Sequence, residues 1–338
     1  MIKENHSLKA YNSFGIDVSA RYFVEITKVA QLKVLLESDL FKYNARLILG
    51  GGSNVLLTKD FPGLVLKLSI RGISIEKEAA DFVWLKAMAG EVWHDVVQYS
   101  LKNGLGGLEN LSLIPGQVGA APMQNIGAYG VELESVFDHL EAIEISSAEI
   151  KKFHKDDCAF GYRESVFKNI YKDKFIIVSV VFKLSKSQDQ VNITYGAIRD
   201  VLNKKGITKP DAKAVSDAVI AIRQSKLPNP KELGNAGSFF KNPVIEKQQL
   251  ERLKADYPEI PSYDLGNDQF KVPAGWLIEQ CGWKGKVVGN TGSHKKQALV
   301  LVNYGNASGK EIKTLADEIR KSVYDKFGIK ITPEVNII

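Results

Sequence analysis

The stretch 106-GGLENLSLIPGQVGAAPMQNIGAYG-130 is long, rich in small residues and low in charge, and it lacks the periodicity of a helix or a strand. Ordered loops of this length are uncommon in compact domains and tend to be functional. Upstream, 49-LGGGSNVLL-57 places three consecutive glycines after a predicted strand at 46–49, which exposes backbone N–H groups without obstruction by a Cβ atom. We therefore expect two loops at strand ends that together enclose a large dinucleotide.

Neither glycine stretch has the spacing of a familiar nucleotide fingerprint. G-x-G-x-x-G and G-x-x-x-x-G-K-[ST] are both absent from 49–57, so a Rossmann site and a P-loop are not supported. Three glycines alone are more often a tight turn than a cofactor site. The dinucleotide interpretation therefore depends on the two loops acting together.

The remaining chain mixes short strands and helices without a strict βαβ alternation. Strands are predicted at 46–49, 64–68, 83–89, 140–145 and 175–184, and helices at 91–103 and 212–226. A last helix begins at Ser308, where Glu311 completes a capping-box pattern, and it ends at Gly328. Its apolar stripe consists of Ile312, Leu315, Ile319 and Val323.

Composition restricts the class of protein. With 338 residues, 44% hydrophobic and 25% charged, the chain can form two or three domains with sizeable cores. The formal net charge is +6, but the lysines are scattered, which argues against nucleic acid. No apolar segment is long enough to span a membrane, and the N-terminus lacks the apolar core of a signal peptide, so a cytoplasmic protein is expected.

The cysteines and histidines do not suggest a metal site. Cys158 and Cys281 have no partner at CxxC spacing, and we expect two buried thiols. His94 and His294 have no potential ligands at metal-binding spacing, and each is interpreted as structural or solvated. We expect no metal.

Five motifs in order carry a specific resemblance: LGGGSNVLL, LENLSLIPGQVGAAPMQNIGAYGVEL, CAFGYRESVFK, GNAGSFFKNP and TPEV. Together they resemble the UDP-N-acetylenolpyruvoylglucosamine reductase (MurB) family, flavoenzymes of peptidoglycan precursor synthesis, over nearly the whole chain. The resemblance implies an α+β chain with a two-part FAD-binding region of the PCMH type and a C-terminal α/β substrate-binding domain. The implied boundaries are 1–70 together with a C-terminal strand at 331–338, then 71–200, and then 201–330.

The resemblance also implies the cofactors, FAD and the electron donor NADPH, with FAD held largely by the backbone of the two glycine loops. The implied FAD-binding residues are Gly50, Gly51, Gly52, Ser53, Asn54, Pro115, Gly116, Gly119, Ala120, Gln124, Asn125, Gly127 and Ala128.

Three residues match the catalytic positions of the family. Ser238 would donate a proton to carbon, Arg163 would stabilise the enolate, and Glu334 would polarise the enolate or tune the acid. On pattern alone, Ser238 is a loop serine, Arg163 a solvated arginine and Glu334 an exposed terminal carboxylate.

The implied substrate is a UDP-sugar, UDP-N-acetylglucosamine enolpyruvate. The matching positions are Tyr195, Lys226, Asn242 and Gln297 for the UDP moiety, with Tyr129 between flavin and substrate. The insertion at 189–202, which carries Tyr195, is typical of the longer, type I members. We expect a monomer. Two other functions stay open: a PCMH-type flavin oxidase of another alcohol or sugar, and a non-catalytic UDP-sugar binding module.

Overall fold

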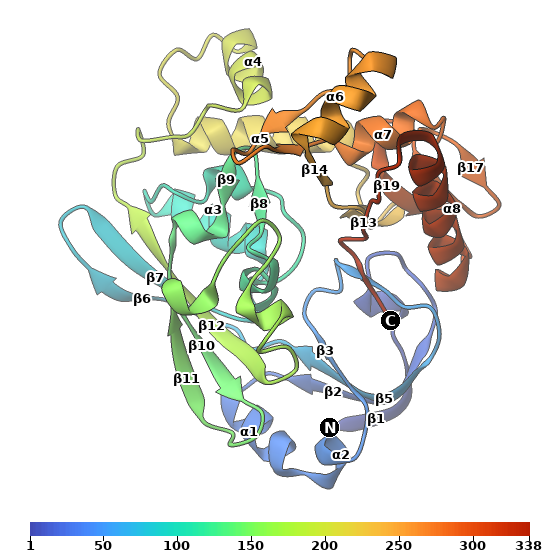
Figure 1. Cartoon of the computed structure of the whole chain (residues 1–338). Coiled ribbons are helices and arrows are strands. Elements are labelled where there is room, and N and C mark those ends of the chain that lie inside the picture. The colour runs from blue at the N-terminus through green and yellow to red at the C-terminus, as the bar shows by residue number, and fades with distance from the viewer. The chain divides into compact units, whose positions relative to one another are not determined.

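The computed structural model describes all residues, 1–338, and contains two compact units (Figure 1). Unit 1 consists of residues 1–6, 20–51 and 62–225, and unit 2 of residues 7–19, 52–61 and 226–338. Each unit is thus built from three separate segments of the chain. None of the helices combines the length and the apolar character that crossing a bilayer requires.

Unit 1 contains two main sheets. The first has the strand order β1-β2-β5-β3, in which β3 and β5 are parallel. Its strands are β1 (Ile2–Ser7), β2 (Ser19–Ile26), β5 (Phe61–Leu68) and β3 (Arg46–Leu49). The second sheet is antiparallel with the order β11-β10-β12-β7-β6. Its strands are β11 (Ile150–His154), β10 (Phe137–Glu144), β12 (Phe175–Ser185), β7 (Phe82–Met88) and β6 (Ile73–Glu78).

The five-stranded sheet has one apolar and one polar face, because side chains alternate along each strand. In β7, Val83, Leu85 and Ala87 are buried against α3 (Trp93–Lys102) and the 105–137 segment, whereas Trp84 and Lys86 point to the opposite face. Near one end of β10 and β12 a further cluster packs the two sheets together with α1 (Val29–Glu37) and α2 (Asp39–Lys42). Away from this cluster, the second face of the sheet carries charged groups such as Lys86 and Glu141.

Two helices form a separate apolar cluster in unit 1. They are α4 (Gly196–Lys204) and α5 (Ala212–Lys226), and their inward residues lie at helical spacing. The cluster consists of Ile198, Leu202, Val215, Ala218, Val219 and Ile222.

The 106–130 loop has more order than its sequence predicts. It contains 3-10 turns at Glu109–Leu111, Val118–Ala120 and Pro122–Gln124, and its end forms a hairpin of β8 (Gly127–Ala128) and β9 (Val131–Glu132). Tyr129 and Gly130, between these strands, have φ of 52° and 81°. Left-handed conformations at both positions are typical of a type I′ hairpin turn, which matches the twist of the strands. The sequence concealed this hairpin because each strand has only two residues.

Unit 2 combines small sheets with three helices. One sheet has the order β13-β19-β18-β17, another β14-β16-β15, and β4 pairs in parallel with β20. The strands are β13 (Gly234–Ser238), β19 (Gln297–Asn303), β18 (Thr291–His294), β17 (Val287–Val288), β14 (Val244–Glu246), β16 (Gln269–Lys271), β15 (Tyr263–Asp264), β4 (Val55–Leu56) and β20 (Asn336–Ile337). The helices are α6 (Lys247–Asp256), α7 (Ala274–Gln280) and α8 (Gly309–Phe327), and α7 and α8 pack on the core with Phe239 and Phe240.

The longer predicted elements are confirmed. The predicted helix at 212–226 coincides with α5, and α8 has the predicted capping box, stripe and left-handed Gly328. The prediction of two buried thiols is wrong for one of them. Cys158 is buried, and burial raises the pKa of its thiol to about 12, whereas Cys281 caps the end of α7 and is partly exposed.

Replacing Ser308 should destabilise unit 2 measurably. In the structure the Ser308 hydroxyl accepts a hydrogen bond from the Glu311 N–H, and the Glu311 carboxylate accepts one from the Ser308 N–H. Ser308→Ala removes the first bond and should lower the free energy of unfolding by about 1 kcal/mol in urea denaturation. Lys310→Ala, at an exposed position of the same turn, is the control and should change it by less than about 0.5 kcal/mol. Equal effects of both variants would contradict the role of the cap.

Candidate functional site

The two glycine loops approach each other closely within unit 1. A Cβ atom on Gly51 would lie 3.0 Å from the Cα atom of Gly116, and one on Gly50 would lie 3.4 Å from Oε1 of Gln117. The backbone N–H groups of Gly50, Gly51, Gly116 and Gln117 donate to no acceptor within the protein. Because such N–H groups are rarely left unpaired in native structures, they are available to an anionic ligand.

The second loop is held by backbone hydrogen bonds to the segment before α3. The Trp93 N–H donates to the Gly116 carbonyl, and the Val118 N–H donates to the Glu91 carbonyl. Gly119 donates to the Ala89 carbonyl, and a Cβ atom on Gly119 would lie only 2.6 Å from the Cβ atom of Ala89. Gly119 is predicted to bind the cofactor, but its close packing against Ala89 already requires a glycine at this position.

A lysine that the sequence did not single out lies beside these loops. Lys67 on β5 is half-buried, and its ammonium donates to Oε1 of Gln117 at 3.0 Å and to the Leu68 carbonyl at 3.3 Å. The Gln117 amide in turn donates to the Gly90 carbonyl. Burial lowers the pKa of Lys67, and no carboxylate forms an ion pair with it. The charge of Lys67 is thus available to an anion at the glycine loops.

Arg163 and the 127–132 hairpin are joined in unit 1. The Arg163 guanidinium donates to the Gly127 carbonyl at 2.6 Å. Asn125, fully buried with φ of 42°, donates to the Glu132 carboxylate and to the Gly161 carbonyl, and so ties the hairpin to the loop that carries Arg163. The Asn125 side chain is therefore occupied by the protein. Arg163 itself has φ of 56°, a conformation that costs free energy and is concentrated at functional sites.

The predicted substrate residues Tyr129 and Tyr195 also meet in unit 1. Their rings pack edge to face with centroids 5.1 Å apart. The guanidinium of Arg223, on α5, lies near enough to the Tyr129 phenol to interact with it electrostatically, and its buried Nε has no hydrogen-bond partner. Burial lowers the pKa of Arg223 and raises the pKa of Tyr129. Arg223 has no sequence motif that marks it, although it lies three residues before the predicted Lys226.

His94 has a structural role, and it supports the loop that leads to Gly116. Its Nδ1 accepts a hydrogen bond from the Leu113 N–H at 2.9 Å. Leu113 has φ of 57° and lies three residues before Gly116. Burial lowers the pKa of His94, which keeps Nδ1 unprotonated and able to accept this bond.

In unit 2, Ser238 and Glu334 are brought together by backbone hydrogen bonds. Ser238 is exposed at the end of β13, next to Phe239 and Phe240, which are fully buried in the core. The Glu334 N–H donates to the Phe239 carbonyl at 2.8 Å. The two buried rings hold the chain on the C-terminal side of Ser238 in the core. Glu334 is half-buried, so the reading from pattern alone as an exposed terminal glutamate is wrong.

Residues of the first glycine loop that belong to unit 2 contact the C-terminal strand. The Asn54 amide donates to the Glu334 carbonyl at 3.2 Å, and both the backbone and the side chain of Asn336 donate to the Asn54 carbonyl. Gly52 has φ of 64°, and a Cβ atom there would collide with the Tyr11 carbonyl. The conformation and packing of Gly52 thus require glycine at this position.

Asn242 and Gln297 meet at the beginning of α7. Oδ1 of Asn242 accepts a hydrogen bond from the Ala274 N–H at 2.9 Å, and a Cβ atom on Gly275 would lie 3.2 Å from Oε1 of Gln297.

The other predicted residues differ in exposure: Pro115, Ala120 and Lys226 are exposed, and Ser53, Gln124 and Ala128 are half-buried. Of the three predicted catalytic residues, Arg163 belongs to unit 1, and Ser238 and Glu334 belong to unit 2.

Comparison with known proteins first identifies the class of protein to which the chain belongs. Residues 20–149 match the FAD binding domain family, so the chain is a flavoprotein. The N–H groups of the glycine loops and the charge of Lys67 fit FAD, whose diphosphate needs donors and a cation. Residues 229–338 match the C-terminal domain of UDP-N-acetylenolpyruvoylglucosamine reductase.

Curated relatives then give the family. The chain is 53% identical over 337 residues to the UDP-N-acetylenolpyruvoylglucosamine reductase of Flavobacterium johnsoniae, covering 100% of this chain and 99% of the relative. It is 46% identical to that of Pseudomonas aeruginosa, covering 99% and 98%. The chain belongs to the UDP-N-acetylenolpyruvoylglucosamine reductase family. The fold is similar to the crystal structure of the Thermus caldophilus enzyme, with a TM-score of 0.67, 21% identity, and coverage of 100% and 98%.

Removing the charge of Lys67 should weaken FAD binding. Lys67→Met should raise the Kd for FAD roughly tenfold, equivalent to about 1.4 kcal/mol, as measured by quenching of flavin fluorescence on the apoprotein. The thermal stability of the apoprotein should not fall, because the variant removes a half-buried charge that lacks a carboxylate partner. Lys172→Met, at an exposed position of the same unit, should leave the Kd unchanged. An unchanged Kd for Lys67→Met would reject this contribution.

His94 should make stability depend on pH. Because burial lowers its pKa below the ordinary 6.5, the unfolded chain binds the proton more readily than the folded one. This contribution is complete above pH 6.5 and is lost as the pH falls from 6.5 through the lower folded value. His94→Gln should show a smaller loss of unfolding free energy between pH 7.5 and 5.5 than the wild-type protein. Burial also lowers the pKa values of His6 and His294, so the difference between the two proteins isolates His94. Parallel pH profiles of the variant and the wild-type protein would contradict this contribution of His94.

Proposed function

We propose that the protein uses NADPH to reduce UDP-N-acetylglucosamine enolpyruvate to UDP-N-acetylmuramate in peptidoglycan precursor synthesis. The observation that carries this proposal is the match to named reductases over the whole chain, together with the paired glycine loops of unit 1. FAD, held by the glycine loops and Lys67, would supply the redox chemistry by which two electrons pass from NADPH to the enolpyruvyl double bond. NADPH and the enolpyruvyl sugar use one pocket in turn.

This reaction has three requirements that residues of the protein must meet. Hydride addition to the β-carbon leaves negative charge on the α-carbon and its carboxylate, so a cation must hold that carboxylate. A proton must then reach the α-carbon, and water must be excluded from both steps.

Arg163 holds the carboxylate in this proposal. Its guanidinium is permanently charged and presents paired donors that suit a carboxylate. Its strained backbone and its bond to the Gly127 carbonyl support a fixed orientation, since a positioned donor stabilises developing charge without reorganisation. It acts beside Tyr129, Tyr195 and Arg223, which bind the substrate.

Ser238 delivers the proton from its Oγ to the α-carbon. A hydroxyl in this role needs placement more than activation by a neighbouring base, and the buried Phe239 and Phe240 provide that placement. Glu334 polarises the enolate or tunes the acidity of Ser238. Its N–H, bonded to the Phe239 carbonyl, supports a position close to the serine.

The remaining predicted assignments belong to the same proposal. Lys226, Asn242 and Gln297 bind the UDP moiety, with Lys226 as a point charge for the diphosphate. The division into two FAD-binding subdomains, 1–70 with 331–338 and 71–200, and a substrate-binding domain, 201–330, completes the assignment. We also propose a cytoplasmic monomer of the longer, type I subtype.

Separating the two half-reactions tests the proposal. In Ser238→Ala, NADPH should bleach the flavin anaerobically at the wild-type rate, because no proton transfer to carbon is involved. Reoxidation by the enolpyruvyl substrate should slow by roughly 10²–10⁴-fold. Both rates are measured by stopped-flow absorbance at the flavin band.

Ser225→Ala, which removes an exposed hydroxyl at the end of α5, is the control and should change neither rate. Equal loss of both half-reactions in Ser238→Ala would reject the serine as the proton donor. A wild-type flavin that NADPH bleaches and oxygen alone reoxidises, with no response to the enolpyruvyl sugar, would reject the reductase in favour of an oxidase.

A further inference from the structure

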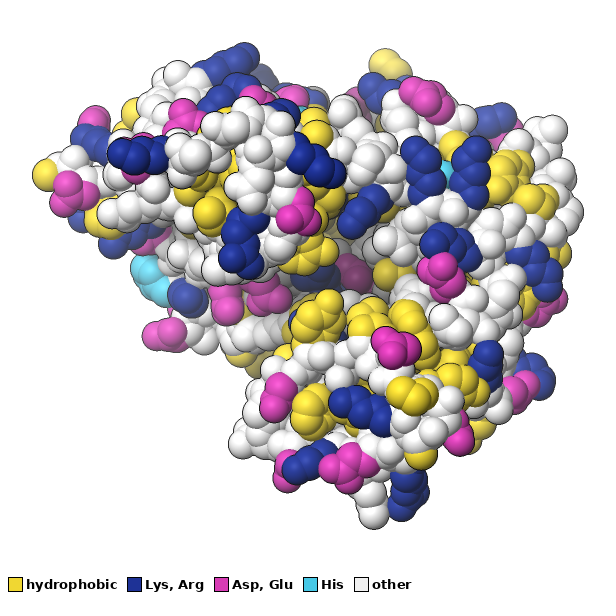
Figure 2. All heavy atoms as spheres, turned by 90° about the horizontal axis from the view of Figure 1, so that it is seen from above, with side chains coloured by type: hydrophobic (Ala, Val, Ile, Leu, Met, Phe, Trp, Pro, Cys, Tyr) yellow, Lys and Arg dark blue, Asp and Glu magenta, His cyan; other side chains and the backbone are white.

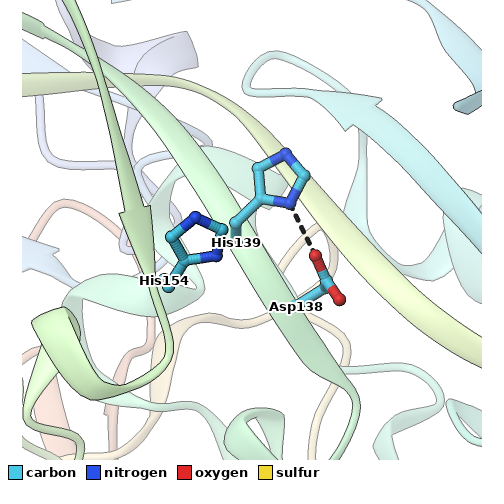
Figure 3. Close-up of side chains that lie close together, drawn as sticks. All are labelled: Asp138, His139 and His154. Atoms are coloured by element: carbon cyan, nitrogen blue, oxygen red, sulfur yellow. Dashed lines mark hydrogen bonds and ion pairs between the residues drawn. The ribbon is translucent and has the colours of Figure 1, made fainter.

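The polar face of the five-stranded sheet carries a cluster of two histidines and a carboxylate (Figure 3). His139 on β10 and His154 on β11 are direct cross-strand partners. A register shift between Phe137 and His139 places a β-bulge at Asp138, so that Asp138 and the adjacent His139 reach the same point. One ligand atom from each of Asp138, His139 and His154 lies within 4.8 Å of the others.

His139 is enclosed by carboxylates on both of its nitrogens. Nδ1 lies 2.7 Å from Oδ2 of Asp138, and Nε2 lies 3.5 Å from Oε1 of Glu76 on β6. The residue is only 4% exposed, and Nε2 has no hydrogen-bond partner. A histidine that binds a metal through one nitrogen usually donates its other N–H to a carboxylate, and His139 has carboxylates in position for both roles.

The surrounding groups orient these side chains. The indole N–H of Trp84 donates to Oδ1 of Asp138 at 2.7 Å, which leaves Oδ2 directed to the cluster. The charged groups around it are Glu76, which lies 4.0 Å from the ammonium of Lys152, and Lys77 and Lys183, which lie over the Trp84 ring. One carboxylate and two imidazoles thus come together, and Glu76 lies at the other nitrogen of the His139 ring. None of these residues takes part in the hydrogen bonds of the glycine loops.

We propose that Asp138, His139 and His154 bind one divalent transition-metal ion of the Zn²⁺ class. The ligands are a carboxylate oxygen of Asp138, Nδ1 of His139 and one ring nitrogen of His154, with water in the fourth position. Mixed nitrogen and oxygen ligands suit Zn²⁺, whereas Ca²⁺ and Mg²⁺ prefer oxygen alone. The ion replaces the proton between Nδ1 and Asp138, and the ring then carries its proton on Nε2 and donates it to Glu76.

The distances require only a local movement. Metal–ligand bonds of about 2.0–2.1 Å place ligand atoms roughly 3.4 Å apart, which is closer than the 4.8 Å limit observed here. His154 is exposed, so its side chain can change rotamer to close this gap. Nδ1 of His139 and Oδ2 of Asp138, which lie 2.7 Å apart, must separate slightly to admit the ion. The bound ion would then connect the edge strand β11 to the bulge in β10.

Metal titration of the flavin-loaded protein tests the site. The protein is treated with EDTA, desalted, and titrated with Zn²⁺ by calorimetry and with Co²⁺ by its d–d absorption. We expect one equivalent bound, Co²⁺ bands of tetrahedral intensity, and a thermal midpoint that rises with Zn²⁺. His154→Gln should weaken binding at least tenfold while leaving flavin content and the circular dichroism spectrum unchanged.

Two further variants separate direct from indirect effects. Trp84→Phe removes only the orienting hydrogen bond to Asp138 and should weaken Zn²⁺ binding by roughly 10–100-fold. His6→Gln, also in unit 1, removes a histidine outside the cluster and should bind Zn²⁺ as the wild-type protein does. The absence of saturable binding, or binding that His154→Gln and His139→Asn leave unchanged, would overturn the proposal and identify an adventitious ion only.

Discussion

The close approach of the glycines in two loops is the constraint on which the proposed cofactor site depends. Gly51 and Gly116 approach so closely that a side chain on Gly51 would have to displace backbone atoms. The same absence of side chains leaves the N–H groups of both loops open to an anion. One geometric feature therefore determines both the packing of these loops and the open N–H groups that we propose bind the FAD diphosphate. Lys67 adds charge at this point without a carboxylate that would neutralise it.

Each unit fixes its own functional side chains before any ligand is present. In unit 1, Arg163 is tied to the hairpin through Gly127 and Asn125. In unit 2, the carbonyl of Phe239 binds the N–H of Glu334, so the serine and the carboxylate share one support. These supports are backbone hydrogen bonds and buried rings. Because they are already ordered, little conformational entropy is lost when the substrate binds. The proposed chemistry thus draws on two separately ordered groups.

Sequence patterns were reliable where a local rule determines the structure. The capping box at Ser308, the left-handed Gly328 and the stripe of α8 follow from local geometry, and so does the alternation in β7. The five motifs also indicated the family. The patterns could not show that the Asn125 side chain is buried and occupied by Glu132 and Gly161, because those partners come from distant or irregular segments. Lys67 and Arg223 were missed for the same reason: each lies in an ordinary strand or helix, and only the fold brings it to the site.

The parallel pair of β4 and β20 has a consequence for how the protein is made. Asn54 and Thr58 bond to residues 280 positions later in the chain. Their loop cannot reach its final form until residues 334–338 have been synthesised, whereas the sheets of unit 1 need only residues up to about 185. A nascent chain that stalls before residue 336 lacks the partner strand of β4 and would expose the apolar lining of unit 2.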